Sequence, residues 1–285
     1  MTRFRSRLLA ILVVLGVLTA GTLVGPRAMA PRTSVSPDTD PLSATADSLA
    51  QRLQKAHGAE AFASAPYLRF TFAIDAPDGT RVIGRHLWNK NTGDYRVEWT
   101  SGADTSYVAL INVREVTDGV PSGEAYRNGT RLENQAATEA RRTAYGRFVN
   151  DTYWLLAPLK TMDSGVNRAY LPESSTATHE VLHLTFGDVG LTPDDEYWLY
   201  VSTETGRLDR WAFHLQGMDA SAPPQVFDWT SPVTLEAPAG TVTLSTRKEA
   251  VNGSRSILTN ELALPSRVPD DAFSSPTPML GTDRK

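Results

Sequence analysis

From residue 67 onward, apolar and polar residues alternate along most of the chain, which is the pattern of half-buried β-strands. In the first such segment, Leu68, Phe70, Phe72 and Ile74 share one side and the residues between them share the other. The same pattern recurs in residues 82–88, 95–99, 105–113, 178–186, 196–202, 207–215, 225–230, 241–247 and 256–264. Short turns join these segments, so we expect one antiparallel sheet that is strongly curved or closed.

Residues 42–57 have helical spacing instead, because their apolar residues fall on one stripe. Gly58 follows, where a left-handed residue commonly ends a helix. His57 falls in the last turn, where a cation is favourable, and we interpret it as such a helix-end charge rather than as a functional residue.

The longest aromatic-rich run with helical spacing is Ala144–Val166. Asn150 or Asp151 is a plausible cap within it, and Pro158 is expected to stop it. We expect this run to be a helical plug packed into the hollow of the sheet. The predicted fold class is therefore α+β: a single curved antiparallel β-sheet, a half-barrel, wrapped over an N-terminal helix and a central helical plug.

The first thirty residues resemble an export signal, with arginines at 3, 5 and 7, an apolar span at Leu8–Val24 and a small-residue site at Ala28-Met29-Ala30. Pro31 is a poor residue to follow a cut, so an uncleaved N-terminal anchor stays open as the alternative. Either form predicts a periplasmic or otherwise extracytoplasmic location. The expected organisation is a signal peptide or anchor at 1–30, a flexible tether at 31–41, a half-barrel domain at 42–275 and a disordered tail at 276–285.

Composition and motifs exclude several classes of function. The net charge of -4 is spread without a basic stripe, so we expect no nucleic-acid partner. The chain has no cysteine, which excludes disulfides, thiolate zinc sites and cysteine nucleophiles. No second apolar span follows the first, so at most one N-terminal membrane span is expected. G-x-S-x-G, P-loop and G-x-G-x-x-G motifs do not occur, and we predict no catalytic residue and no cofactor.

His179-Glu180-Val181-Leu182-His183 matches the H-E-x-x-H zinc signature of many metallopeptidases. That motif needs a helix, on which residues four apart lie on one face. The surrounding alternation of Leu182, Leu184 and Phe186 favours a strand, where the two histidines would be roughly 13 Å apart and too far to share a zinc ion. We therefore favour a strand without metal, with the zinc peptidase kept as an alternative.

Two groups of residues are candidates for a ligand site. Aromatic residues on the alternating strands and on the central run could line a cavity, although an ordinary core is an equally simple interpretation. Charged residues of the central run could hold a polar head group, or could pair to orient the plug inside the sheet. The cavity candidates are Phe70, Phe72, Trp99, Phe148, Tyr153, Trp154, Trp198, Tyr200, Trp211 and Phe213, and the polar cluster is Arg147, Asp151 and Lys160.

The plan of exported N-terminus, helix, long meander with a helical plug and closing Val268–Phe273 segment resembles the Lol-type lipoprotein carriers. Residues Tyr197–Ser202 through Thr205–Leu208 are similar to the strand–turn–strand signature of those carriers, without the aspartate of the D-x-x-T-G turn. Residues 145–160 look closer to an uncharacterised family of exported bacterial proteins. The resemblance implies a LolA-like half-barrel over residues 42–275, with an apolar cavity for acyl chains and no catalytic residue or metal.

Three functions stay open on these grounds. The first is non-enzymatic binding or carriage of a hydrophobic ligand in the cell envelope, the partner being a lipid, an acyl chain, another hydrophobic small molecule or a lipoprotein. The second is the exported zinc peptidase. The third is a structural envelope protein whose hollow is simply filled by the central run.

Overall fold

The computed structural model describes residues 41–187 and 191–281 and contains one open, thirteen-stranded antiparallel sheet in the order β6-β5-β4-β3-β2-β1-β13-β12-β11-β10-β9-β8-β7. The strands are β1 (Tyr67–Ala76), β2 (Gly79–Asn89), β3 (Asp94–Ser101), β4 (Thr105–Thr117), β5 (Val120–Arg127), β6 (Thr130–Arg131), β7 (Val166–Tyr170), β8 (His179–Phe186), β9 (Glu196–Ser202), β10 (Leu208–His214), β11 (Gln225–Ala237), β12 (Gly240–Ala250) and β13 (Ser256–Ala263). The helices are α1 (Pro41–His57), α2 (Ala59–Ser64) and α3 (Asn134–Leu156), with short 3-10 turns at Ala157–Leu159 and Pro172–Ser174.

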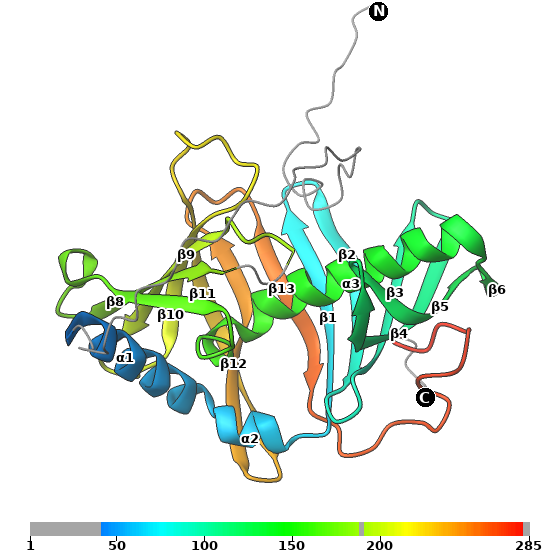
Figure 1. Ribbon diagram of the computed structural model, residues 1–285, viewed down its shortest axis with the longest axis horizontal. Helices are drawn as coiled ribbons and strands as arrows, with labels where there is room; N and C mark the ends of the chain where they lie inside the picture. The colour runs from blue at the N-terminus through cyan, green and yellow to red at the C-terminus, as the bar shows by residue number, and fades with distance from the viewer. Residues whose placement is uncertain (1–40, 188–190, 282–285) are drawn as a thin grey trace, which may run out of the picture.

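The sheet is curved into a half-barrel, as predicted. Two meanders, β1–β6 and β7–β13, meet where β1 pairs with β13 in the middle of the sheet. Figure 1 shows α3 lying across one face, from the β5–β6 edge toward β8 and β10, while α1 and α2 lie along the side formed by β8 and β12. We call the face covered by these helices the inner face. The expected plug inside a half-barrel is therefore present.

Helix α1 begins at Pro41, one residue earlier than expected, because the fixed φ of proline suits the first turn of a helix. Its stripe of Ala46, Leu49, Ala50 and Leu53 is completely buried against the inner face. The predicted signal or anchor and the tether up to residue 40 lie outside the described residues. Within the described ranges, no helix is both long enough and apolar enough to cross a bilayer.

His57 does not act as a charge at the end of α1, and that prediction is wrong. Its side chain is buried, with Nδ1 2.7 Å from the Thr243 carbonyl and Nε2 accepting from the Leu208 N–H at 3.1 Å. Burial lowers the pKa of His57 to about 4, so the ring is neutral at neutral pH. It joins α1 to β10 and β12. Gly58 has the left-handed conformation predicted for it, with φ 79°.

Helix α3 is 23 residues long and begins at Asn134, ten residues before the predicted run. Its first half has few aromatic residues, but the small side chains of Ala140 and Ala144 are buried against the sheet. Asp151 is a buried residue inside the helix and not a cap. The helix ends near Pro158 as expected, since this proline lies in the 3-10 turn that follows.

The chain after β13 runs along the outer face of the sheet, where an ion pair on β3 binds it. Arg96 and Glu98 are buried and paired, with Nε 2.6 Å from Oε1. Arg96 donates to the carbonyls of Ala272, Ser275 and Thr277, and Glu98 accepts from the N–H groups of two residues near the end of the described chain, 279 and 280. We call residues 272–281 the C-terminal strap. Its path through residues 276–281 differs from the predicted disordered tail, because main-chain hydrogen bonds to a buried ion pair fix it.

Candidate functional site

The inner face under α3 carries two apolar clusters. The larger one combines α1, the C-terminal half of α3 and strands β1 and β8–β13, and the smaller one combines the N-terminal half of α3 with β3, β4 and β5. Trp88 packs against both clusters. Helix α3 contributes buried residues to both clusters, so access to much of this face depends on where the helix lies.

Two aromatic residues of α3 fill the hollow over the larger cluster. The ring of Trp154 has its centroid 4.7 Å from that of Trp211, 5.1 Å from Phe227 and 5.6 Å from Phe213, in edge-to-face contacts. Tyr153 lies 5.0 Å from Tyr197. These are the distances of favourable aromatic pairs. In the observed arrangement the plug occupies the space that an apolar ligand would need.

The smaller cluster is also closed by α3. Phe148 makes edge contacts with Trp88 at 5.2 Å and with Tyr95 at 4.9 Å. Trp99 stacks on Tyr107 at 4.9 Å, and the guanidinium of Arg147 lies 5.3 Å from the Trp99 ring. From Arg147 to Trp154 the helix therefore presents aromatic and cationic side chains to aromatic rings of the sheet.

The structure places most of the predicted cavity residues on the inner face, but not Trp198 and Tyr200. Tyr197 and Leu199 point inward on β9, and neighbouring residues of a strand point to opposite faces. Trp198 instead stacks on His183 at 4.9 Å on the outer face. The other predicted cavity residues each belong to, or pack against, one of the two inner clusters. They are Phe70, Phe72, Trp99, Phe148, Tyr153, Trp154, Trp211 and Phe213.

The predicted polar cluster is divided. Arg147 and Asp151 lie together under the helix, where Arg147 donates to the Ile83 carbonyl at 2.8 Å. Lys160 is outside this region and pairs with Asp163 at 2.7 Å, with both side chains substantially exposed. Only the first two residues of the predicted cluster therefore belong to the candidate site.

Two further polar residues, not predicted from the sequence, complete this cluster. His86 on β2 has Nε2 3.2 Å from Oδ2 of Asp151 and Nδ1 2.5 Å from the Tyr95 hydroxyl. His86 also stacks on Phe70 at 4.5 Å. These two residues are His86 and Tyr95. The alternation of β2 and β3 places both on the inner face, but it does not indicate that α3 brings the Asp151 carboxylate next to His86.

Burial favours the uncharged forms of His86 and Tyr95. Desolvation lowers the pKa of His86, although the neighbouring Asp151 opposes this change. Desolvation raises the pKa of Tyr95 well above 10. A neutral His86 can accept the Tyr95 O–H at Nδ1 only as the tautomer that carries its proton on Nε2, facing Asp151. A Cβ at Gly84 would lie 2.8 Å from Nε2, so glycine leaves room for this contact. The cluster joins α3 to β2 and β3.

Lys248 on β12 is a second buried polar residue that the sequence analysis missed. Its side chain is fully buried on the inner face, and Nζ lies 4.8 Å from the ring centroid of Trp229. It donates to the Ser245 carbonyl at 2.8 Å and approaches the Thr259 hydroxyl at 3.3 Å. Its position in the sequence, between Arg247 and Glu249, resembles a solvated charged run, which is why the pattern did not single it out.

The H-E-x-x-H motif lies on strand β8, as predicted. His179 and His183 have separate partners, because His179 approaches Asp209 at 3.4 Å and His183 approaches Glu196 at 3.1 Å. The glutamate of the motif pairs with Arg52 of α1 at 2.5 Å. Among the described residues, no three His, Cys, Asp or Glu side chains are grouped as a metal site. The strand geometry removes the basis of the zinc hypothesis.

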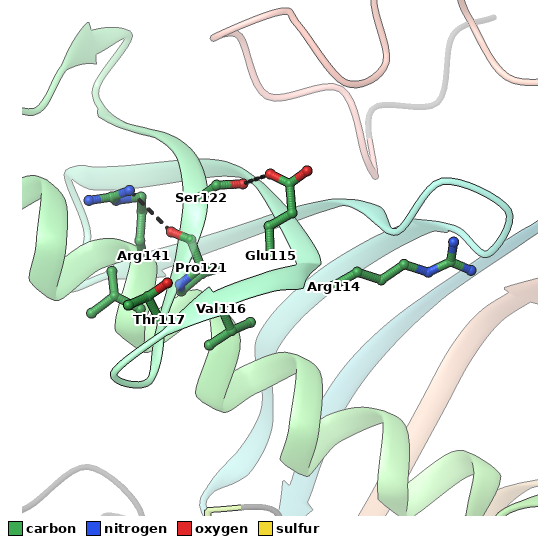
Figure 2. Close-up of a pocket in the computed structure, with 8 residues that line it drawn as sticks. Arg114, Glu115, Val116, Thr117, Pro121, Ser122 and Arg141 are labelled. Carbon is green, nitrogen blue, oxygen red and sulfur yellow. Dashed lines mark hydrogen bonds between the residues drawn. The ribbon is translucent and has the colours of Figure 1, made fainter.

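Two surface pockets of about 490 and 420 Å³ lie in the first meander. The first is at the end of the β4–β5 hairpin and is shown in Figure 2, where Arg141 reaches the Pro121 carbonyl and Ser122 bonds Glu115. The second lies on the outer face beside Phe273 of the C-terminal strap. The first pocket is lined mainly by polar and charged residues, and the second combines polar residues with Tyr95, Ile111 and Phe273.

No family model and no curated protein matches the sequence. Among solved structures, the chain is similar to a DUF1329 family protein from Desulfovibrio piger, with 13% identity and a TM-score of 0.44 over 82% of this chain and 98% of that one. It is also similar to a domain from Vibrio parahaemolyticus named for outer membrane lipoprotein sorting, with 8% identity and a TM-score of 0.44 over 81% of this chain and 97% of that one. MucB has 14% identity and a TM-score of 0.23, over 81% of this chain and 62% of its own. At these values the likenesses assign neither a family nor a function to the chain, and the Lol-type resemblance stays a prediction.

Proposed function

We propose that this protein is a non-enzymatic binder or carrier of a hydrophobic ligand in the bacterial cell envelope, working outside the cytoplasm. The observation that carries the proposal is that α3 covers an aromatic wall with aromatic side chains of its own, above all Trp154 over Trp211 and Phe227. In this proposal, a ligand displaces the side chain of Trp154 from the hollow. The rings of Trp211 and Phe227 then contact an acyl chain in place of the indole.

The way in which α3 is held supports this proposal. The helix is joined to the sheet by few polar contacts, of which Arg147 to the Ile83 carbonyl and Asp151 to His86 are the main ones. Contacts between flat rings tolerate sliding and replacement better than a continuous hydrogen-bonded ladder does. Displacement of this one helix would expose both apolar clusters together.

The extracytoplasmic location and the single N-terminal signal or anchor belong to the same proposal. They rest on the basic end, apolar span and small-residue site of the first thirty residues. A ligand-binding domain of this kind needs no cofactor, and the partner that we propose is a lipid, an acyl chain or the acylated end of a lipoprotein.

Native mass spectrometry of the full chain, purified from bacterial membranes without denaturation, tests the proposal. We expect a fraction of the protein to carry a mass that matches an acyl-chain compound, released by organic extraction. Protein that retains no such mass, and that binds no added apolar probe at micromolar concentration, would contradict ligand carriage.

The observed packing also favours a second candidate, a structural envelope protein whose hollow is permanently filled. The rings of Trp154 and Tyr153 pack closely against aromatic side chains of the sheet. If α3 never leaves the sheet, its amides will exchange with solvent only on global unfolding. Exchange of α3 at lower free energy than the strands beneath it would favour the carrier instead.

A further inference from the structure

Lys248 is a buried lysine without an acidic partner. None of the described carboxylates forms an ion pair with it, and its contacts are the Ser245 carbonyl, the Thr259 hydroxyl and the face of Trp229. Desolvation lowers its pKa well below 10.5. A lysine without an acidic partner lowers the stability of an apolar wall, because burial removes the hydration of its amine. Methionine would fill a similar volume without this cost in free energy.

The neighbouring indoles also lack acceptors. Trp211 and Trp229 are in edge contact at 5.2 Å, and the Nε1 atoms of both are buried without a hydrogen-bond partner in the described part of the chain. An indole N–H is a donor only, and most buried donors in folded proteins find an acceptor. Lys248 lies on the same wall and donates to Ser245 and Thr259, while the indole N–H groups of Trp211 and Trp229 have no acceptor among the described residues.

The same wall lies under the plug. Helix α3 contacts β12, and its Trp154 covers Trp211 at 4.7 Å. Trp211 is thus part of the aromatic surface that we propose for an apolar chain. Its indole N–H and that of the neighbouring Trp229 lack acceptors among the described residues, and Lys248 lies over the Trp229 ring. An amphiphile with an acceptor-only head group would satisfy both parts of this wall at once.

We propose that Lys248, with the indole N–H groups of Trp211 and Trp229, binds the anionic head group of the hydrophobic ligand, a carboxylate or a phosphate. This inference rests on the proposed function and adds the class of ligand to it. The head group supplies acceptors to the three side chains and a counter-charge that favours the ammonium form of the lysine. The apolar chain takes the place of the Trp154 side chain against Trp211, Phe213 and Phe227.

Titration of the full chain with four probes tests the inference: oleate, methyl oleate, dioleoyl phosphatidylglycerol and inorganic phosphate. We expect oleate or the phospholipid to bind at least about tenfold more tightly than methyl oleate, which has the same chain without the charge. The tighter of the two anionic lipids identifies carboxylate or phosphate as the group recognised. Inorganic phosphate that binds as tightly as the lipids would overturn the inference, because the apolar wall would then play no part.

A Lys248→Met variant separates the head group from the chain. We expect it to lose at least about tenfold in affinity for the preferred anionic lipid and to bind methyl oleate as the unchanged protein does. Lys90→Met is the matched control, since Lys90 is a half-buried lysine over the ring of Phe62 at 3.9 Å, at the end of β2. It should leave both affinities unchanged.

The protonation of Lys248 gives a readout that needs no variant. By NMR of its side-chain resonances, we expect the pKa of Lys248 to rise when oleate is bound and to stay unchanged on addition of methyl oleate. Equal affinity of Lys248→Met and the unchanged protein for oleate, or a Lys248 pKa that oleate does not raise, would overturn the head-group inference and leave the carrier intact. Failure of every lipid to bind would overturn the proposed function as well.

Discussion

His86 on β2 and Asp151 on α3 lie 3.2 Å apart, and the side chain of each is almost completely buried. Their contact joins the middle of the plug to the first meander of the sheet. Asn150 donates to the other oxygen of Asp151 at 2.8 Å, and Tyr95 bonds the other nitrogen of His86. The position of α3 on the inner face is therefore determined by a short polar chain embedded between two aromatic clusters.

Replacement of Asp151 by alanine should weaken the attachment of α3. We expect Asp151→Ala to lower the free energy of unfolding by roughly 1–3 kcal/mol, because it removes the buried contact between the Asp151 carboxylate and His86 Nε2. The amides of α3 should also exchange faster with solvent than those of β2. Lys160→Ala is the control, since its exposed pair with Asp163 is worth less than about 1 kcal/mol. Equal losses in the two variants, measured by urea denaturation, would contradict the anchoring role of Asp151.

The strands could be predicted from the sequence because one buried face makes the period of two visible. Leu182 and Leu184 on β8, and Val97 on β3, are examples in which alternation alone gives the correct face. Trp198 shows the limit of the same reasoning. Its aromatic character predicts a place in the cavity. Its neighbours on β9, Tyr197 and Leu199, point inward, so Trp198 points to the outer face.

The remaining parts of the candidate site depend on contacts between segments distant in the chain, which a local pattern does not contain. His57 looked like a charge at a helix end, and only the approach of Thr243 and Leu208 shows that it is buried and neutral. The unpaired state of Lys248 likewise depends on β13 and β11 on either side of β12. The pattern of apolar residues therefore predicted the sheet and the helix that covers it. The environments of His57 and Lys248 became visible only from the packing of these elements.

Protonation of His57 should make stability depend on pH. Its folded-state pKa of about 4 lies below the ordinary value of 6.5, so the unfolded chain binds the proton more readily. Its contribution to stability is therefore complete above pH 6.5 and is lost as the pH falls toward 4, by roughly 3 kcal/mol in total. Burial lowers the pKa of His86 too, which adds a loss of the same sign.

Urea denaturation between pH 7.5 and 4.5 checks this dependence. The variant His57→Gln keeps a donor for the Thr243 carbonyl and an acceptor for the Leu208 N–H but does not titrate. We expect a flatter profile for this variant than for the unchanged chain. Identical slopes would show that His57 is protonated equally in the folded and unfolded states.

Removal of the C-terminal strap should destabilise the protein through Arg96 and Glu98. A chain that ends at residue 271 leaves this buried pair without its main-chain partners, and we expect a loss of roughly 3–5 kcal/mol. Removal of residues 282–285 alone keeps the bonds that the described residues make to the pair and serves as the control. If both truncations melt at the temperature of the full chain, the strap contributes nothing to stability.

The histidines of β8 should not form a stoichiometric zinc site. Because they are four residues apart on a strand and have separate acidic partners, we expect metal analysis after incubation with zinc and dialysis to give the same low content for the full chain and for His183→Ala. One zinc per chain that disappears in His183→Ala would restore the peptidase hypothesis. A small loss of stability is expected in the variant, since His183 stacks on Trp198.

Truncation of Trp154 distinguishes a removable plug from a permanent core. Trp154→Ala should lower the free energy of unfolding by roughly 3–5 kcal/mol, as expected for a large ring removed from a packed site. If the space is a ligand site, the variant should also gain affinity for a fluorescent apolar probe such as N-phenylnaphthylamine, since the void would be walled by Trp211, Phe213 and Phe227.

Trp99→Ala is the matched control for this experiment. It removes a ring of the same size from the smaller cluster, where Trp99 stacks on Tyr107 at 4.9 Å, and it leaves the contacts of Trp154 intact. We expect a comparable loss of stability but no comparable gain in probe binding, because the proposed ligand wall lies at the other end of α3. Equal gains in both variants would mean that the probe enters any cavity, and the distinction between plug and core would fail.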